Sequence, residues 1–319
     1  IFVIQILELL VKNKFIILTL ISIITIGYCD ISGVTYFNYS SDDGFGMKRT
    51  YFTYKNQISD ELTFKFQTDV GQVGTDNRWT AYLKKAQADW NVSNGMKVSM
   101  GLIGMNMFNV QEKTWGNRFV AKSALDTAGW GVASADMGIG MEFSLNLDQS
   151  EKNPLTVSLL LTNGEGYKNS DVDDNQKLSI QALYGEKRLD KNSGYNLGIV
   201  YSSVDDTENN TERVIGFFGG GSYGNFVSGA EFYVKTDEAG PLNETSSSYK
   251  SFYMNYDFSD SLGIFVRKDF NDPDEWFQIT ETEILMAGFI WTPTKGLAIC
   301  PNIVDDGEQT FKMNFQFKF

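Results

Sequence analysis

The most constraining feature of the sequence is an alternation of apolar and polar residues that recurs along most of its length. In the last segment, the alternating set is Phe311, Met313, Phe315, Phe317 and Phe319 against Lys312, Asn314, Gln316 and Lys318. Residues 62–70, 135–145 and 252–258 repeat this pattern. Successive side chains of a β-strand point to opposite faces of a sheet, so a two-residue period predicts strands with one apolar face and one polar face. No long stretch shows a convincing helical period, and the sequence therefore predicts an all-β fold.

The alternating segments predict about sixteen strands, each close to the length at which a tilted strand crosses a bilayer. They are 31–41, 46–57, 61–72, 78–92, 95–105, 132–147, 154–163, 176–186, 195–204, 212–221, 225–236, 247–258, 261–270, 281–292, 296–304 and 309–319. Turns such as 92–95 and 258–261 are short, whereas connections such as 163–175 and 236–248 are longer and acidic. This alternation of turns and loops is typical of a transmembrane antiparallel β-barrel. An even strand count follows if both ends of the chain face the periplasm.

The N-terminal residues are typical of a secretory signal. Lys12-Asn13-Lys14 precedes the apolar stretch 15–26, which is shorter than the about 20 residues that a membrane-spanning helix needs. We expect residues 1–29 to be a cleaved signal peptide and residues 30–319 to form one barrel domain. Two alternatives are a lipoprotein acylated on Cys29 and an uncleaved hydrophobic anchor over residues 1–26.

A soluble β-sandwich would show the same alternation, because its apolar faces pack together in a core. Three features favour a barrel: the export signal, a strand that ends at Phe319, and aromatic residues near strand ends, where the two membrane interfaces would lie. These aromatic residues are Tyr51, Phe52, Tyr54, Trp79, Tyr82, Trp90, Tyr184, Tyr195, Tyr201 and Trp291. We therefore expect the apolar faces to meet lipid and the polar faces to line a lumen.

The composition excludes several classes of function. The chain has no His and only two Cys, so it lacks the residues for a Ser-His-Asp triad, a histidine-ligated metal or a disulfide framework. Its net charge of −13 argues against nucleic acid as a partner. The acidic stretches 42–43 and 171–175 resemble calcium-binding loops but lack the EF-hand spacing. We expect no metal, no cofactor and no catalytic residues.

Three stretches carry a resemblance to a known family: 48–54, 61–69 and 82–90, followed by Gly101-Leu-Ile-Gly104. They resemble the phosphate-selective porin O and P family. The resemblance implies a sixteen-stranded, trimeric solute channel in the outer membrane of a Gram-negative bacterium. The strand ending in Phe319 resembles the terminal assembly signal of outer-membrane proteins, which implies that the cell's outer-membrane assembly machinery is a partner.

The longest connection, residues 106–130, holds the first group of candidate site residues. In porins the third long loop folds into the lumen and narrows it, and by its position this connection corresponds to that loop. Its candidate residues for the pore constriction are Glu112, Lys113, Trp115, Arg118, Lys122 and Asp126. Gly104, Gly116 and Gly129 would permit the inward bend. The alternative is a solvated surface loop.

Charged residues on the polar faces of the strands form the second group. The basic residues expected to line the lumen on strands two to five are Arg49, Lys55, Lys65, Lys85 and Lys97. The acidic residues expected there are Asp69, Asp89, Asp136, Glu142 and Asp257. If Lys85 faces inward, strict alternation points Lys84 outward. Opposed basic and acidic walls would set a transverse field, although any water-filled lumen carries mixed charges.

The function that these observations favour is that of a porin. We expect passive diffusion of small hydrophilic solutes, anions among them, with no covalent step. The alternative is an outer-membrane barrel that acts as an enzyme or as a surface-binding protein rather than as a general pore.

Overall fold

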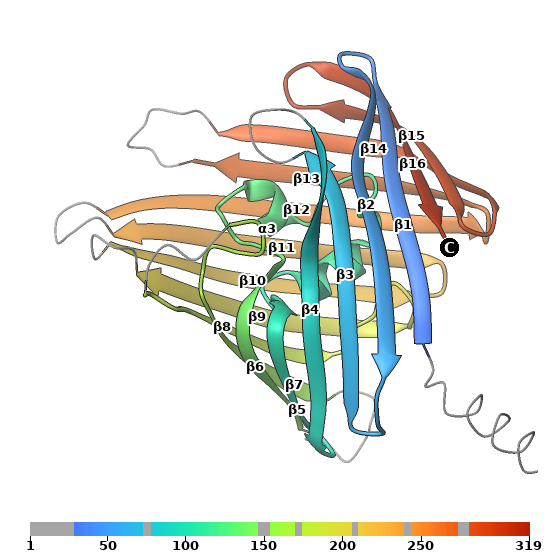
Figure 1. Cartoon of the computed structure of the whole chain (residues 1–319). Coiled ribbons are helices and arrows are strands. Elements are labelled where there is room, and N and C mark those ends of the chain that lie inside the picture. The colour runs from blue at the N-terminus through green and yellow to red at the C-terminus, as the bar shows by residue number, and fades with distance from the viewer. Residues whose placement is uncertain are drawn as a thin grey trace, which may run out of the picture.

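Sixteen strands close into one antiparallel barrel, in which each strand pairs with its neighbours along the chain and β1 pairs with β16 (Figure 1). The computed structural model describes residues 29–72, 78–145, 154–169, 174–205, 210–238, 244–273 and 281–319. The first eight strands are β1 (Cys29–Ser40), β2 (Gly44–Gln57), β3 (Leu62–Gln72), β4 (Trp79–Ser93), β5 (Met96–Gly104), β6 (Ala135–Leu145), β7 (Leu155–Thr162) and β8 (Lys177–Gly185). The others are β9 (Gly194–Asp205), β10 (Thr211–Tyr223), β11 (Phe226–Glu238), β12 (Glu244–Ser259), β13 (Leu262–Asp272), β14 (Thr282–Thr294), β15 (Leu297–Asp305) and β16 (Gln309–Lys318). The predicted all-β barrel is confirmed.

The expected two-faced strands are present. In β12, the outer-face residues Phe252 and Met254 are 43% and 49% exposed, whereas the alternate residues Ser251 and Tyr253 are buried. The same pattern holds in β6, where Met137, Ile139 and Met141 are exposed. No second layer of the described chain covers these apolar rows, so this barrel does not build its core as a β-sandwich does.

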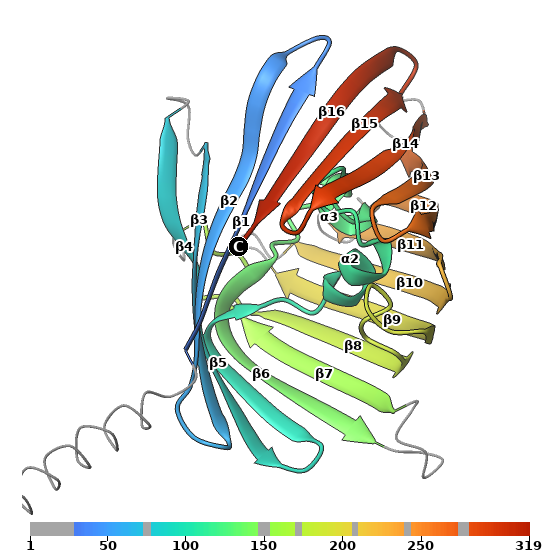
Figure 2. The ribbon, with the colours of Figure 1, turned by 90° about the vertical axis from the view of Figure 1, so that its right-hand side faces the viewer.

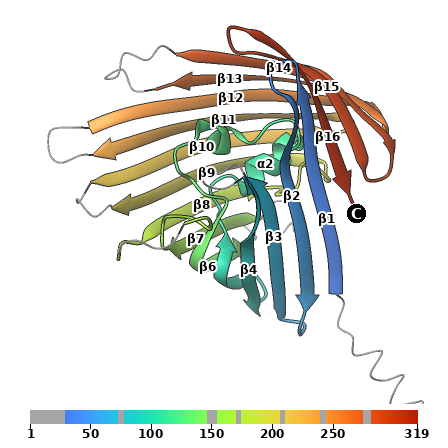
Figure 3. The same ribbon diagram turned by 45° about the horizontal axis from the view of Figure 1, so that its top comes forward.

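In the described part of the chain, two short helices interrupt the β-structure, and the apolar–polar alternation did not predict them. They are α2 (Asn109–Trp115) and α3 (Ala124–Ala128), both in the connection between β5 and β6. Figures 2 and 3 show them within the ring of strands, where α2 contacts β10 and β11 and α3 contacts β12. Gly116 and Gly129 end the helices with φ values of 74° and 73°, which residues with a Cβ adopt at a cost. In the part of the chain that the structure describes, no helix is long and apolar enough to span a membrane.

The helices rest on an apolar core inside the barrel. Val200, Val214, Phe218, Tyr233 and Tyr249 point inward from β9 to β12 and pack with loop residues in one buried cluster. Beside it, the Trp115 ring lies 5.3 Å from the Tyr253 ring and 5.6 Å from the Phe265 ring, centroid to centroid. On this side the inner face is mixed, because large apolar side chains that pack against the loop alternate with buried polar ones such as Glu231 and Ser251. The expectation of a polar inner face therefore holds only in part for this half of the barrel.

The first and last strands meet where the barrel closes. The Phe319 N–H donates to the Gly33 carbonyl at 3.2 Å, and the Gly33 N–H donates to the Phe319 carbonyl at 3.1 Å. The connections after even-numbered strands include tight turns at 94–95, 224–225 and 295–296, and most of the longer connections follow odd-numbered strands. The predicted signal peptide, apart from Cys29, and residues 171–173 of the acidic stretch lie outside the described residues.

Candidate functional site

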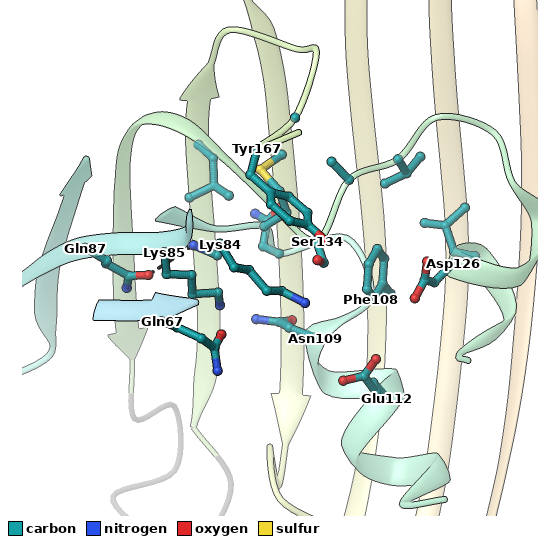
Figure 4. A pocket seen from close by; sticks show the side chains of 18 of the residues that line it. Gln67, Lys84, Lys85, Gln87, Phe108, Asn109, Glu112, Asp126, Ser134 and Tyr167 are labelled. Atoms are coloured by element: carbon teal, nitrogen blue, oxygen red, sulfur yellow. Dashed lines mark hydrogen bonds between the residues drawn. The ribbon is translucent and has the colours of Figure 1, made fainter. Parts of the chain in front are cut away.

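A cavity of about 660 Å³ lies between the inner wall of β2–β6 and the 106–130 loop. Figure 4 shows Lys84 and Lys85 entering it from the wall, with Glu112 and Asp126 on the opposite side. Its basic lining residues are Arg49, Lys65, Lys84, Lys85, Lys97, Lys113, Arg118, Lys122 and Lys168. Its acidic lining residues are Glu112, Asp126, Glu142 and Glu165. Among the described residues, the cavity thus has a basic lining in a chain whose net charge is −13.

Lys84 does not point outward, where strict alternation with Lys85 would place it. In the pairing of β3 with β4, Gln67 faces Lys85 and Thr68 faces Leu83, so Lys84 is the extra residue of a β-bulge. A bulge lets two consecutive side chains share one face. The Lys84 ammonium lies inside the barrel, where it donates to the Tyr51 hydroxyl at 3.1 Å and lies 4.4 Å from the centroid of the Tyr51 ring.

A second bulge brings in Lys48, a residue that sequence reasoning did not select. In the pairing of β1 with β2, Tyr36 faces Arg49 and Phe37 faces Met47, so Lys48 has no partner. Its ammonium lies 3.1 Å from the Asn314 amide oxygen and 3.3 Å from the Val120 carbonyl. The adjacent basic pairs Lys48-Arg49 and Lys84-Lys85, one at each bulge, were the available sequence signal.

The predicted basic wall lies mostly together. Arg49, Lys65, Lys85 and Lys97 all line the cavity. Lys55 is not among the lining residues; it pairs in register with Lys65 and is exposed. Gly104 leaves room for Lys85, because a Cβ on this glycine would lie 2.4 Å from the Lys85 Nζ.

The predicted acidic residues are dispersed and mostly engaged. Asp69 is fully buried and forms an ion pair with Arg49. Glu142 pairs with Lys187 at 3.0 Å and with Lys97 at 3.4 Å.

The other three predicted acidic residues also lie at separate places in the barrel. Asp89 accepts hydrogen bonds from the Gln87 amide at 2.7 Å and the Ser99 hydroxyl at 2.5 Å. Asp136 is buried and accepts from the backbone N–H groups of Met137 and Gly164. Asp257 is exposed near the turn end of β12. Among the described residues, these five carboxylates therefore do not form an acidic wall opposite the lysines.

Four of the five candidate charges of the 106–130 loop pair with one another. Arg118 pairs with Glu112 at 2.8 Å and with Asp126 at 3.2 Å, and Lys122 pairs with Asp126 at 3.0 Å. Lys113 has no carboxylate within ion-pair distance among the described residues. Its burial, followed by the nearby charge of Arg188, lowers its pKa below the usual lysine value. The net positive charge of the cavity comes from the wall lysines, Lys113 and Lys168.

Trp115 lies away from the cavity. It is fully buried, and its indole N–H donates to the Ala121 carbonyl at 2.9 Å. Arg267 packs over its ring, with the guanidinium carbon 5.1 Å from the centroid. Trp115 thus holds the loop against the wall instead of lining the open space.

Arg267 and Asp269 form a buried anchor for the loop, which sequence reasoning missed. Both side chains are fully buried, and the guanidinium donates to the Asp269 carboxylate at 2.7 Å and 2.8 Å. Its other terminal nitrogen donates to the Lys122 carbonyl at 2.5 Å. Opposite charges two residues apart on one face of β13 were the only sequence signal.

The described residues hold no group of three or more His, Cys, Asp or Glu side chains placed to bind a metal ion. In the 42–43 turn, the Asp42 carboxylate accepts hydrogen bonds from the hydroxyls of Ser41 and Thr310 at 2.8 Å and 2.7 Å. Ammonium, guanidinium and amide donors face the open space of the cavity, and such donors favour anions.

The chain matches no protein-family model and no curated protein. It is similar in structure to OmpF of Salmonella typhi, with a TM-score of 0.65, 10% identity, and coverage of 92% of this chain and 98% of that one. It is also similar to an anion-selective porin from Comamonas acidovorans, with a TM-score of 0.64, 9% identity, and coverage of 92% and 100%. The outer-membrane channel DcaP of Acinetobacter baumannii gives a TM-score of 0.56 at 11% identity, with coverage of 91% and 97%. At these identities the likeness establishes a shared fold: the chain has the sixteen-stranded fold of the porins.

Proposed function

We propose that the protein is an outer-membrane porin that lets small hydrophilic solutes diffuse passively and favours anions. The observation that carries this proposal is the contrast between the basic cavity, with nine basic and four acidic lining residues, and the acidic chain around it. A field of one sign in a water-filled, low-dielectric passage concentrates ions of the opposite sign. Transport of this kind needs no covalent step.

Membrane insertion is part of the same proposal. The exposed rows of Phe, Met, Leu and Ile on the outer face suit the acyl chains of a bilayer, and a closed barrel leaves no unpaired strand edge in lipid. Export through a signal peptide over residues 1–29, assembly through the signal at Phe319, and a homotrimeric state belong to the proposal as well. So does the narrower resemblance to the phosphate-selective porin O and P family.

The 106–130 loop is proposed to be the third extracellular loop and to narrow the pore. Its packing on β10–β12 fills one half of the barrel interior, so the open path runs along the basic wall of the other half. In this arrangement the loop side of the path is bordered by charged residues: Glu112, Lys113, Arg118, Lys122 and Asp126. Trp115 lies on the opposite side of the loop and fixes it to the barrel wall.

The test is the reversal potential of the purified, folded protein in planar bilayers under a potassium chloride gradient. We expect stepwise single-channel conductance. The sign of the reversal potential should be the one produced when chloride is more permeant than potassium. The variant Lys268→Gln, which changes a lysine on the outer face that pairs with Glu283, serves as a charge-matched control and should leave the potential unchanged. Folded protein that never conducts, or a channel that prefers potassium, would contradict the proposal.

A further inference from the structure

A second cavity of about 470 Å³ adjoins the first inside the barrel. Met47, Gly71 and Trp79 line it, and these residues lie near the ends of β2, β3 and β4 from which the connections β1–β2 and β3–β4 depart. Among the residues that the structure describes, four line both cavities: Arg49, Arg118, Lys122 and Lys168. All four are basic, so cationic side chains line the boundary between the cavities, here called the neck.

Three different elements supply the neck. Arg49 comes from β2, Arg118 and Lys122 come from the 106–130 loop, and Lys168 comes from the segment 163–169, which follows β7. The position of Lys168 in the neck therefore depends on how segment 163–169 is held.

Segment 163–169 is tied to the barrel wall at both ends of its inward turn. The buried Asp136 carboxylate accepts the Gly164 N–H at 2.7 Å, and the Tyr167 N–H donates to the Ala135 carbonyl at 3.0 Å. Gly166 has a φ of 80°, and a Cβ there would lie 2.4 Å from the Ala133 Cβ, so the turn needs glycine. These contacts fix the backbone directly before Lys168.

The side chain of Tyr167 completes the attachment. Its hydroxyl accepts a hydrogen bond from Arg49 at 3.1 Å, and its ring lies 5.9 Å from the Tyr82 ring, centroid to centroid. The Lys168 ammonium lies 5.5 Å from the centroid of the Tyr82 ring and 6.0 Å from that of the Tyr167 ring. The two tyrosines thus hold Lys168 by its cationic end.

Lys168 differs from the other three members of the neck in its partners. Arg49 pairs with Asp69, Arg118 with Glu112 and Asp126, and Lys122 with Asp126. Over the described ranges, no carboxylate lies within ion-pair distance of Lys168, and its side chain is exposed to the cavities. Among the four neck residues, Lys168 is therefore the one whose N–H donors are available to a solute.

We propose that Lys168 is a specificity-determining residue, whose ammonium directly contacts anions as they cross the neck between the two cavities. This inference rests on the proposed porin function and adds a second loop to the path that the 106–130 loop borders. Desolvation and the neighbouring Arg49 lower the pKa of Lys168, in keeping with its place among other cations.

The experiment measures the chloride-to-potassium permeability ratio of Lys168→Gln, Lys168→Arg and the outer-face control Lys268→Gln. For Lys168→Gln we expect a fall of about two- to threefold, the factor that one unit charge produces at roughly 7 Å in water. Lys168→Arg and Lys268→Gln should keep the wild-type ratio. If Lys168→Gln conducts with the wild-type ratio, the inference is overturned while the porin proposal stands; if the wild-type protein does not conduct, the porin proposal itself is overturned.

A second variant tests the contact after folding is complete. Lys168→Cys, folded and inserted in the bilayer, is treated with a cationic or an anionic thiol reagent. The cationic reagent should return the ratio toward the wild-type value, and the anionic reagent should lower it further. Identical ratios after both reagents would overturn the inference. Treated wild-type protein controls for Cys300, which is buried, and Cys29, which lies at the start of β1.

Discussion

Buried charges decide where the loop rests. Arg267 and Asp269 are fully buried, and their ion pair is supplemented by the hydrogen bond of Arg267 to Lys122 and its packing on Trp115. A buried charge without its partner is costly, so this pair tolerates the loss of neither member. Alternation placed both residues on one face of a strand, but only the fold showed that the loop covers them.

Replacing Arg267 with methionine should lower the free energy of unfolding by about 3–5 kcal/mol, because the Asp269 carboxylate then stays buried without its partner. The measurement is urea unfolding in lipid vesicles, followed by tryptophan fluorescence. The neighbouring outer-face variant Lys268→Met should cost less than about 1 kcal/mol, since its pair with Glu283 is exposed. Equal losses for the two variants would mean that the buried pair does not anchor the loop.

At the scale of elements, the strands followed the sequence closely and the 106–130 loop did not. Predicted strand 309–319 corresponds to β16 (Gln309–Lys318), and predicted strand 261–270 to β13 (Leu262–Asp272). Each strand carries its own period, so local pattern is sufficient. The helices α2 and α3 are only 7 and 5 residues long, and their apolar side chains pack against strands distant in sequence. Helices this short do not show a helical period in the sequence.

The bulges are the element-scale feature that changes function. If Lys84 occupied a regular strand, it would face lipid and its charge would not affect permeation. In the observed bulge it faces the cavity beside Lys85. We therefore expect Lys84→Gln and Lys85→Gln each to lower the chloride-to-potassium permeability ratio, measured from reversal potentials. A shift for Lys85→Gln alone would show that the strand is regular here.

For the whole molecule, closure depends on the pairing of the last residues with the first strand. Phe319 exchanges two backbone hydrogen bonds with Gly33, and its ring is on the exposed outer face. The backbone hydrogen bonds do not need the aromatic ring of Phe319. Recognition by the proposed assembly machinery, in contrast, would need this ring.

Phe319→Ala should therefore reduce the amount of assembled barrel in cells by severalfold while leaving refolding in detergent intact. Heat-modifiable gel mobility measures both. Phe317→Ala removes a similar ring from the same outer face and is the matched control, with near-normal assembly expected. Equal yields from the two variants would remove the special role of the terminal residue.

The sequence by itself determined the class of fold, the number of strands and the outward direction of the apolar rows, because a two-residue period is a local property that each strand carries alone. The sequence also predicted that most of the basic wall residues lie on the inner face of the sheet. Only the tertiary structure decided that Lys48 and Lys84 turn inward, that Arg118 and Lys122 pair with carboxylates of their own loop, and that Lys168 joins the neck. These features depend on register shifts between strands and on contacts across the barrel interior. Both involve residues far apart in the chain, so a local period cannot predict them.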